Sequence, residues 1–278
     1  MVGLSALLST YSGDEPDALR DAIESLLDQR HPADEIVLVK DGPLTERSER
    51  TINSLVETAP TITTIGLSHN VGLGRALNAG LEHCSFPLVA RMDADDVAVP
   101  ERFGLQRSYL DAHPDVDVVG GAMAEIDAET GTRHVRSVPT APGEIERMAR
   151  RRSPLNHPTV MFRKHAIEAV GGYADLRSMQ DYDLWVRLLA NGYRLGNLPD
   201  VLVETEVDTG LYARRGGIEY AKYELQLQKR FLEIGHVSKT GALANLAFRL
   251  PARLLPNRLR GVLYRRLFRD PKMTEDER

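Results

Sequence analysis

The fold is decided by the stretch FPLVARMDADD, residues 86–96, in which an apolar run leads directly into three acidic residues. An apolar run this short is typical of a buried strand, so Asp93, Asp95 and Asp96 are expected at a strand's end. Carboxylates this close repel one another, and a hard divalent cation relieves the repulsion while leaving coordination positions open for a phosphate. An acidic surface turn or a helix cap explains the same residues equally well, so the rest of the chain has to decide.

Upstream of this stretch, short apolar strands alternate with amphipathic helices. Strands are expected at residues 4–9, 35–40, 62–66 and 88–92, and helices at 17–29, 46–57 and 74–83. Such βαβ alternation predicts a mostly parallel sheet flanked by helices, with the ligand site at the carboxyl ends of the strands. The loops at 10–14, 41–43 and 93–96 are polar or acidic. Their convergence on one edge of the sheet predicts a pocket for a charged or sugar-like ligand.

Downstream of residue 96 the order of elements changes, and a mixed sheet is expected. Helices are predicted at residues 101–112, 142–151 and 182–190, and strands at 116–123, 134–138, 159–163, 193–198 and 201–206. A boundary is expected near Gly216 and Gly217. The chain is therefore divided into an α/β part, residues 1–215, and a helical extension, residues 216–278.

The composition of the 278 residues is that of a globular protein, with 42% hydrophobic and 27% charged residues. The single cysteine, Cys84, excludes an internal disulfide and a multi-cysteine zinc site. The N-terminus has no basic leader, and no apolar run reaches the length of a membrane span. We therefore expect a protein that is soluble or rests on a membrane surface.

The charge is unevenly distributed along the chain. The net charge is −5, but residues 236–272 hold nine basic residues against one acidic residue, a net charge of +8, which leaves −13 on the remainder. Leucines interleave with the arginines there, so we expect a basic amphipathic tail that docks on anionic lipid. The alternative is a solvated basic helix packed on the acidic body. Nucleic-acid binding is not expected, because aromatic residues are sparse in this stretch and no recognition motif occurs.

Five short motifs follow one another along the chain: STY at 9–11, VKDG at 39–42, NVGLGRALN at 70–78, DADD at 93–96 and QDYDLW at 180–185. Each motif alone is weak, but together they are specific. In these motifs and their order the chain resembles the family 2 glycosyltransferases, over roughly residues 3–215. The resemblance, to the bacterial or archaeal surface-glycan type, implies the glycosyltransferase A-type fold, an α/β Rossmann-like mixed, mostly parallel sheet flanked by helices. It also implies transfer of a sugar from a nucleoside-diphosphate sugar to an acceptor hydroxyl.

The same resemblance implies a donor site. Ser9, Tyr11 and Asp41 would hold the nucleotide base and ribose, with Asp41 accepting a hydrogen bond from the N–H edge of the base. Arg75 would lie near the nucleotide, although an arginine is also at home on an exposed helix surface. The sequence identifies neither the base nor the sugar.

Asp93 and Asp95 match the family's Asp-x-Asp motif. The resemblance implies a divalent metal cofactor, Mg²⁺ or Mn²⁺, that bridges the donor diphosphate and neutralises charge on the leaving group. Asp95 is expected to ligate the metal directly, and Asp93 to contact the ribose or a water on the metal. His157 is a further candidate for a metal or acceptor contact, against the alternative that it only satisfies a local hydrogen bond.

Asp181 is the expected general base. It begins a helix whose residues Tyr182 and Trp185 would face the core, so its carboxylate can point back into the cleft. A base there removes the proton from the acceptor hydroxyl, and the product anomer is inverted. The alternative is a helix N-cap. The family often has Glu-Asp at this point, whereas this chain has Gln180-Asp181, so a second carboxylate is absent.

The acceptor is expected to be a glycan on a lipid-linked intermediate, at the cytoplasmic face of the cell membrane. A single addition is expected, because the Gln-x-x-Arg-Trp signature of processive members is absent. Two other functions stay open. A sugar-nucleotide-forming nucleotidyltransferase would carry a glycine-rich, arginine-bearing loop after the first strand, which this chain lacks. A non-catalytic carbohydrate-binding module is the alternative if Asp181 is only a cap.

Overall fold

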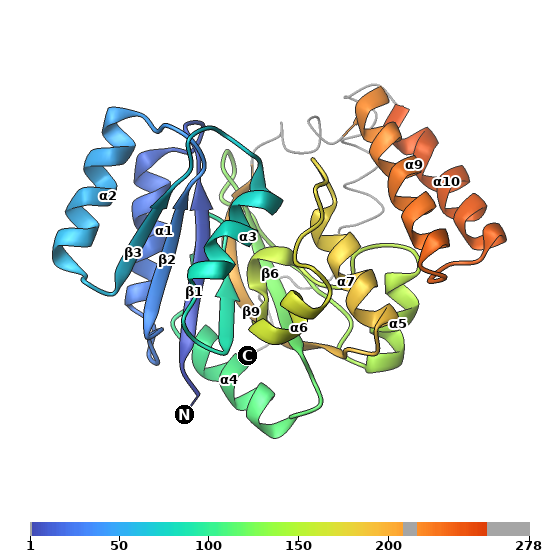
Figure 1. Cartoon of the computed structure of the whole chain (residues 1–278), viewed down its shortest axis with the longest axis horizontal. Helices are drawn as coiled ribbons and strands as arrows, with labels where there is room; N and C mark the ends of the chain where they lie inside the picture. The colour runs from blue at the N-terminus through green and yellow to red at the C-terminus, as the bar shows by residue number, and fades with distance from the viewer. Residues whose placement is uncertain (1, 208–215, 255–278) are drawn as a thin grey trace.

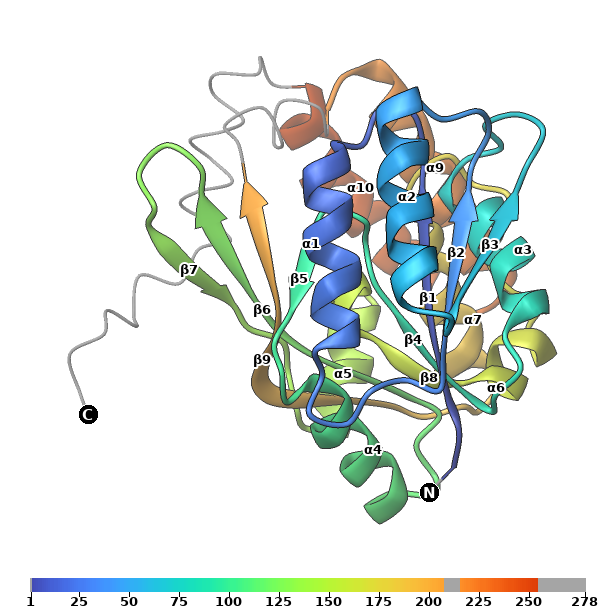
Figure 2. The same cartoon turned by 90° about the vertical axis from the view of Figure 1, so that its left-hand side faces the viewer.

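The computed structural model describes residues 2–207 and 216–254, in which a mixed sheet is covered by helices on both faces (Figure 1, Figure 2). The strands are β1 (Leu4–Thr10), β2 (Glu35–Lys40), β3 (Ile62–Gly66), β4 (Leu88–Arg91), β5 (Asp96–Ala98), β6 (Val118–Asp127), β7 (Arg133–Arg136), β8 (Met161–Arg163) and β9 (Leu195–Val207). The helices are α1 (Pro16–Leu27), α2 (Glu46–Thr58), α3 (Leu73–His83), α4 (Arg102–Ala112), α5 (Pro142–Ala149), the 3₁₀ turn η1 (His157–Thr159), α6 (Lys164–Ala169), α7 (Gln180–Ala190), α9 (Ile218–Glu233) and α10 (Lys239–Leu254).

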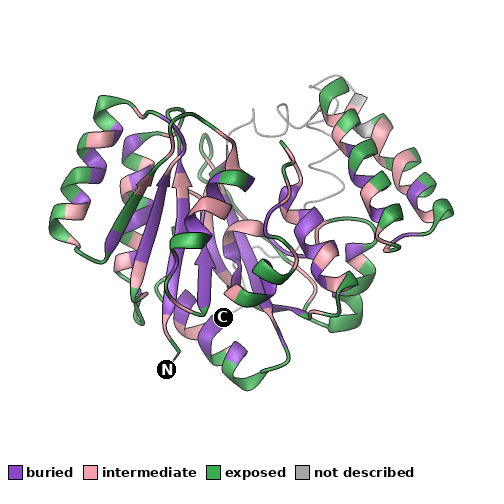
Figure 3. Ribbon diagram, viewed as in Figure 1, coloured by how far each residue is buried: buried purple, intermediate pink, exposed green. Residues whose placement is uncertain are grey.

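The first four strands form the parallel half of the sheet, in the order β3-β2-β1-β4, and α1, α2 and α3 make the crossovers. Successive residues of β1 point to opposite faces. Leu8 belongs to the core cluster built with residues of α1, α2 and α4, and Leu7 to the cluster built with residues of α3, α6 and α7. Strands β1, β2 and β4 are accordingly buried, the edge strand β3 is largely exposed, and the helices expose their outer faces (Figure 3). The βαβ prediction for this half is confirmed.

The second half of the sheet makes it mixed. The order continues β8-β6-β9-β5, with β7 beside β6, and of the eight strand pairings that the described residues form, four are parallel and four antiparallel. The two strands predicted at 193–198 and 201–206 are one strand, β9. Its register against β6 shifts between Gly120 and Ala122, where a bulge absorbs the residues around Pro199. The separation into two strands was therefore wrong.

The helical extension forms an antiparallel pair, α9 and α10, at one end of the molecule beside α7 and α5 (Figure 1). Leu227 and Phe231 of α9 pack against Tyr182 and Val186 of α7. None of the helices in the described ranges is long and apolar enough to cross a membrane.

Two arginines of the predicted membrane-facing tail point inward instead. Arg249 and Arg253 of α10 pair with Glu224 of α9, at 2.5 Å and 2.9 Å, and the Glu224 side chain is fully buried. A buried carboxylate is costly unless it is paired and hydrogen-bonded, so these arginines belong to the helix pair. The expectation that they face lipid was wrong. The tail's other cations from Arg258 to Lys272 lie outside the described residues.

Replacing Glu224 should therefore destabilise the fold. We expect Glu224→Ala to lower the free energy of unfolding by about 3 kcal/mol, because it strands two largely buried guanidinium groups. Urea unfolding measures the loss. The matched control is Glu219→Ala on the same helix, whose exposed carboxylate pairs with Lys222, and its loss should be about 0.5 kcal/mol. Equal losses for the two variants would contradict this account of the helix pair.

Candidate active site

The loop after β1 is folded around Asp14. The Asp14 carboxylate accepts hydrogen bonds from the Thr10 hydroxyl at 3.0 Å and from the Tyr11 amide at 3.1 Å. Burial, followed by the charges of Asp95 and Asp93, raises the pKa of Asp14 to about 6. Asp14 therefore lies near the acidic cluster, in agreement with the predicted convergence of the 10–14 and 93–96 loops. The sequence analysis gave Asp14 no individual role, although its four-residue spacing from Thr10 allows it to close this loop.

Two predicted donor residues lie at the end of β1 and in the loop that follows it. Ser9, the penultimate residue of β1, is partly buried, and Tyr11 exposes 46% of its surface at the loop. An exposed aromatic ring at the carboxyl edge of a sheet offers a stacking surface for a planar ligand. The structure thus places both residues at the edge where the sequence predicted the ligand site.

Asp41 joins the end of β2 to the loop before α3. Its buried carboxylate accepts hydrogen bonds from the amides of Val71 at 2.7 Å and Gly72 at 3.0 Å, one on each oxygen. Gly42 has φ 88°, and a Cβ there would lie 2.6 Å from the amide nitrogen of Asn70. The two loops therefore meet too closely for any other residue at 42. Because each carboxylate oxygen has two lone pairs, Asp41 can hold this loop and still accept from a ligand.

Arg91, at the end of β4, holds Asp93. The Arg91 guanidinium is buried, and its two terminal nitrogens donate to the two carboxylate oxygens of Asp93. Asp95 is an exposed residue, but its carboxylate is partly shielded from water. That desolvation, followed by the charge of Asp93, raises the pKa of Asp95. Burial and the charge of Asp93 raise the pKa of Asp96 to about 8. Repulsion between these carboxylates is a cost that a bound cation would remove.

The carboxylates of this cluster fit a hard cation that takes most of its ligands from substrate phosphates and water. In the described residues no three His, Cys, Asp or Glu side chains are arranged as a ready-made metal cage. Mg²⁺ and Mn²⁺ sites often use one or two carboxylates together with substrate phosphates and water. Asp95 suits that arrangement, whereas Asp93 already has both oxygens on Arg91.

His157 is held by a neighbouring tyrosine. Its Nε2 lies 3.0 Å from the hydroxyl oxygen of Tyr173, and its ring meets the edge of the buried Trp185. Desolvation and the positive charge of Arg91 lower the pKa of His157, so the ring is neutral at pH 7. These contacts support the local structural reading of His157. Trp185 is a core residue, as its helical phase indicated.

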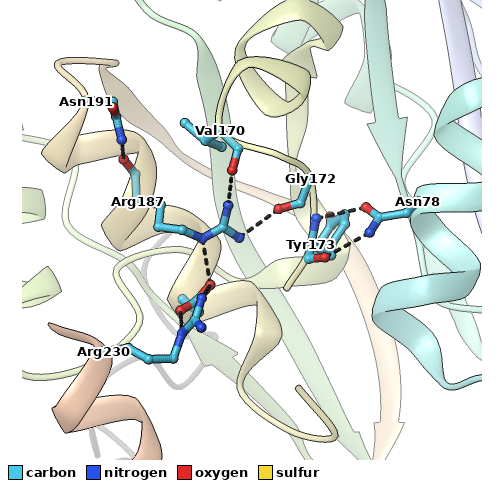
Figure 4. Close-up of polar contacts among 8 residues, drawn as sticks. Asn78, Val170, Gly172, Tyr173, Arg187, Asn191 and Arg230 are labelled. Atoms are coloured by element: carbon cyan, nitrogen blue, oxygen red, sulfur yellow. Dashed lines mark hydrogen bonds and ion pairs between the residues drawn. The ribbon is translucent and has the colours of Figure 1, made fainter. Parts of the chain in front are cut away.

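Tyr173 ties the acidic cluster to α7. Its backbone is clamped by Asn78 of α3, which donates to the Tyr173 carbonyl and accepts from the Tyr173 amide, both at 2.8 Å (Figure 4). Burial is the main reason that the pKa of the Tyr173 hydroxyl is raised, and the charges of Asp181 and Asp93 raise it further. The charge of Arg91 opposes these two carboxylates, one on α7 and one after β4, and lowers the pKa of the same hydroxyl.

Asp181 lies at the second position of α7 and is partly exposed. The residue at the N-cap position is Met179, which has φ 61° and makes no side-chain capping bond. The reading of Asp181 as the N-cap of this helix was therefore wrong. A carboxylate in the first turn is still favoured by the helix dipole.

A pocket of about 350 Å³ opens between the start of α3 and the start of α7. It is lined by residues 70–75, 174–177 and Gln180, the neighbour of Asp181. Arg75 lies on its wall, where the Nε donates to Asp175 at 2.8 Å. Arg75, Gln180 and the loop held by Asp41 thus surround one cavity.

Comparison with solved structures places the fold. TarS from S. aureus, solved in complex with UDP-GlcNAc, superposes with a TM-score of 0.68 at 18% identity, over 90% of this chain and 72% of that one. The mannosyltransferase PcManGT from Pyrobaculum calidifontis, solved with GDP-Man and Mn²⁺, gives a TM-score of 0.62 at 19% identity, over 96% and 80%. The glycosyltransferase A-type fold implied by the motifs is confirmed.

Comparison of sequences finds relatives that match this chain over almost the whole length of both proteins. The amylovoran biosynthesis glycosyltransferase AmsE of Erwinia amylovora is 38% identical over 94% of this chain and 97% of its own. An Escherichia coli protein, UDP-Gal:alpha-D-GlcNAc-diphosphoundecaprenol beta-1,3-galactosyltransferase, is 33% identical over 95% and 96%. The family model for glycosyl transferase family 2 matches residues 5–170. With its motifs, its fold and its full-length relatives in agreement, the chain belongs to glycosyl transferase family 2 and is a glycosyltransferase.

Proposed function

We propose that the protein transfers a sugar from a nucleoside-diphosphate sugar to a hydroxyl of a lipid-linked glycan, one sugar at a time and with inversion at the anomeric carbon. One observation carries the proposal: a single pocket is lined by residues 70–75, the loop that Asp41 holds, and by Gln180, the neighbour of Asp181 in the first turn of α7. An inverting transfer needs a base and a diphosphate site on the two sides of one reacting carbon. We assign Asp181 to the first role and the acidic cluster at residues 93–96 to the second.

In this proposal Ser9, Tyr11, Asp41 and Arg75 hold the nucleotide. Tyr11 offers its exposed ring to the base, and Asp41 accepts from the N–H edge of the base with its remaining lone pairs. Arg75 lies on the wall of the pocket, and its ion pair with Asp175 is exposed to solvent. Because such a pair is weak, Arg75 can exchange Asp175 for a phosphate oxygen of the donor. TarS, which shares the fold, binds UDP-GlcNAc, which supports a nucleotide-sugar donor for this chain.

Asp95 would hold a divalent metal, and Asp93, kept in place by Arg91, would contact the ribose or a water on the metal. When bound, Mg²⁺ or Mn²⁺ would neutralise the negative charge that the departing diphosphate gains. The presence of Mn²⁺ in the PcManGT complex supports this assignment. His157 is given a structural role in this proposal, because its Nε2 contacts the Tyr173 hydroxyl and its ring packs against the buried Trp185.

Asp181 would act as the general base. It accepts the proton of the acceptor hydroxyl while that oxygen bonds to the anomeric carbon and the bond to the diphosphate breaks, so the electron pair leaves with the nucleoside diphosphate. Because attack comes from the face opposite the diphosphate, the anomeric configuration inverts. Gln180 is neutral and lines the pocket beside the base, so a single carboxylate has to do this work.

The lipid-linked acceptor is supported by the E. coli relative, whose name specifies a diphosphoundecaprenol-linked sugar. In this proposal residues 1–215 are the catalytic part. Residues 216–278 hold it as a peripheral protein at the cytoplasmic face of the membrane. The exposed side chains of Leu243 and Phe248 on α10 add an apolar surface to the basic stretch that begins at 236.

Removing the last residues tests this attachment. We expect the 1–254 protein to lose most of its binding to phosphatidylglycerol vesicles, because the deletion removes Arg258, Arg260, Arg265, Arg266, Arg269 and Lys272. A cut at 254 keeps the Glu224 ion pairs, whereas a cut at 235 would break them. Vesicle co-sedimentation measures binding, with phosphatidylcholine vesicles as the control. Equal binding of the full-length and 1–254 proteins to the anionic vesicles would contradict the proposal.

The donor can be identified by thermal unfolding in the presence of UDP, GDP and dTDP, each with and without Mn²⁺. We expect one diphosphate to raise the melting temperature, and only when the metal is present, because ligand that binds the folded state alone stabilises it. The matching nucleotide sugar should then be consumed with release of that diphosphate. No stabilisation by any of the three would contradict a metal-dependent donor site.

A further inference from the structure

A buried carboxylate lies two residues beyond Asp181. Asp183 is fully buried, and its Oδ2 accepts from the Nε of Arg187 on the same helix at 2.7 Å. Arg230, 47 residues further along the chain on α9, donates to Oδ1 at 2.6 Å and to Oδ2 at 3.2 Å (Figure 4). Burying this anion is tolerable because two cations share it. The pair therefore joins α9 directly to the first turn of α7.

Arg187 continues the connection into the site. Its two terminal nitrogens donate to the carbonyls of Val170 at 2.5 Å and Gly172 at 2.7 Å (Figure 4). Gly172 leads into Tyr173, whose backbone Asn78 clamps from the other side. A Cβ at Gly172 would lie 2.5 Å from the Asn78 side-chain oxygen, so the turn fits closely. One polar network thus runs from α9 through α7 to the turn at Gly172 and Tyr173.

The start of α7 needs such support. Met179 has a left-handed backbone conformation, which costs a non-glycine residue about 1 kcal/mol. The backbone preference of Met179 therefore does not favour a helix that begins at this point, and tertiary contacts have to fix it. Tyr182 is fixed from the same side, because its hydroxyl donates to the Ala149 carbonyl at 2.7 Å and its ring meets Phe231 of α9. Asp181 therefore precedes two residues that α9 contacts.

We propose that Arg230 is a positioning residue for the transfer reaction: through its ion pair with buried Asp183 it lets α9 set where the first turn of α7 holds Asp181. This inference rests on the proposed role of Asp181 as general base. It assigns the helical extension a part in catalysis that is separate from membrane attachment. A displacement of about 1 Å in a reacting group can cost about 100-fold in rate, so a charge pair this near the base can matter to catalysis.

The test uses the full-length protein with Arg230→Met and Arg230→Lys. The assay is nucleoside-diphosphate release from UDP-galactose, UDP-GlcNAc or GDP-mannose, whichever the unaltered protein uses fastest, with a GlcNAc-diphosphate lipid acceptor and Mn²⁺. We expect Arg230→Met to lower kcat by about 30-fold while the Kd of the nucleoside diphosphate changes by less than about twofold. Arg230→Lys should recover part of kcat, because an ammonium can pair with Asp183 but not bind it bidentately.

The matched control is Lys229→Met, one residue earlier on α9, where the exposed ammonium contacts Glu233 at 3.8 Å. Its kcat should stay within about twofold of the unaltered protein. Trp185, the chain's single tryptophan, is on α7 between Asp183 and Arg187 and reports by fluorescence whether this helix stays packed. If the fluorescence shows that Arg230→Met is poorly packed, the double variant Asp183→Asn/Arg230→Gln is used in its place. It replaces the ion pair by a neutral hydrogen-bonding pair, and we expect the same fall in kcat for the double variant.

An unchanged kcat in packed protein would overturn the inference, whatever happens to the melting temperature. A parallel loss of kcat and nucleotide affinity would also overturn it, since that would mean general damage to the site. The proposed function has a separate test. It is contradicted if Asp181→Asn keeps the kcat of the unaltered protein. If Asp181→Asn stops transfer and Arg230→Met is silent, the base stands and only the positioning role is lost.

Discussion

Asp181→Asn should reduce kcat by about 1,000-fold while the Kd of the nucleoside diphosphate with Mn²⁺ changes by less than about twofold. The amide keeps the shape of the side chain and its place in the first turn of α7, but it cannot accept the acceptor's proton. None of the proposed nucleotide-binding residues lies on α7, so nucleotide binding should be spared. Steady-state kinetics and calorimetry measure the two quantities.

The control for this variant is Asp111→Asn, at an exposed position on α4, which should leave both quantities unchanged. A fall in kcat smaller than about tenfold would mean that Asp181 is not the general base. A loss of nucleotide binding of similar size to the loss of kcat would assign Asp181 to the donor site instead.

Asp95→Asn should remove the effect of metal on donor binding. We expect Mn²⁺ to tighten nucleoside-diphosphate binding to the unaltered protein by about 100-fold, and to leave binding to Asp95→Asn almost unchanged, because the variant lacks the carboxylate most available to the ion. Asp93→Asn should lose less, since Asp93 is already paired with Arg91. Calorimetric titration of the three proteins with and without Mn²⁺ gives all six affinities.

The matched control for the metal variants is Asp21→Asn, an exposed carboxylate on α1. It should show the full metal effect. If Asp95→Asn kept that effect and Asp93→Asn lost it, the two aspartates would have exchanged roles. If both variants kept it, the acidic stretch after β4 would be a structural turn.

The first half of the sheet could be predicted because its signals are local. Each buried strand is a short apolar run, each helix carries a periodic apolar face, and parallel strands bring their carboxyl-end loops together wherever this alternation occurs. The sequence therefore predicts that the loops at 10–14, 41–43 and 93–96 lie at one edge of the sheet. The family resemblance then gave the candidate residues in those loops their expected roles.

What the sequence could not show depends on pairings between distant residues. Strand β5 is three residues long and exists because it pairs with β9. Asp41 resembled a free ligand group, and only the fold shows its carboxylate on the amides of the 71–72 loop. Arg230 was one helix charge among many until the fold brought it to Asp183. Local pattern carries no information about such partners.

The charge of the basic tail could not be interpreted from the sequence for the same reason. Counting residues between 236 and 272 gave a strongly positive stretch, but charge counting does not separate cations that face solvent from those that pair inside the protein. Arg249 and Arg253 belong to the second group, because Glu224 on α9 is buried between them. The proposed attachment to lipid therefore depends on the charge of residues 255–278, and its test is their removal.

The central claim is that a nucleotide sugar is displaced directly, with Asp181 as the base. It is tested most directly by the anomeric configuration of the product, read by NMR from the one-bond carbon–proton coupling at the new glycosidic linkage. With an α-linked nucleotide sugar such as UDP-galactose and a GlcNAc-diphosphate lipid acceptor, the account predicts a β-linked product. An α-linked product would contradict it, because retention requires a different mechanism from a single attack assisted by one base.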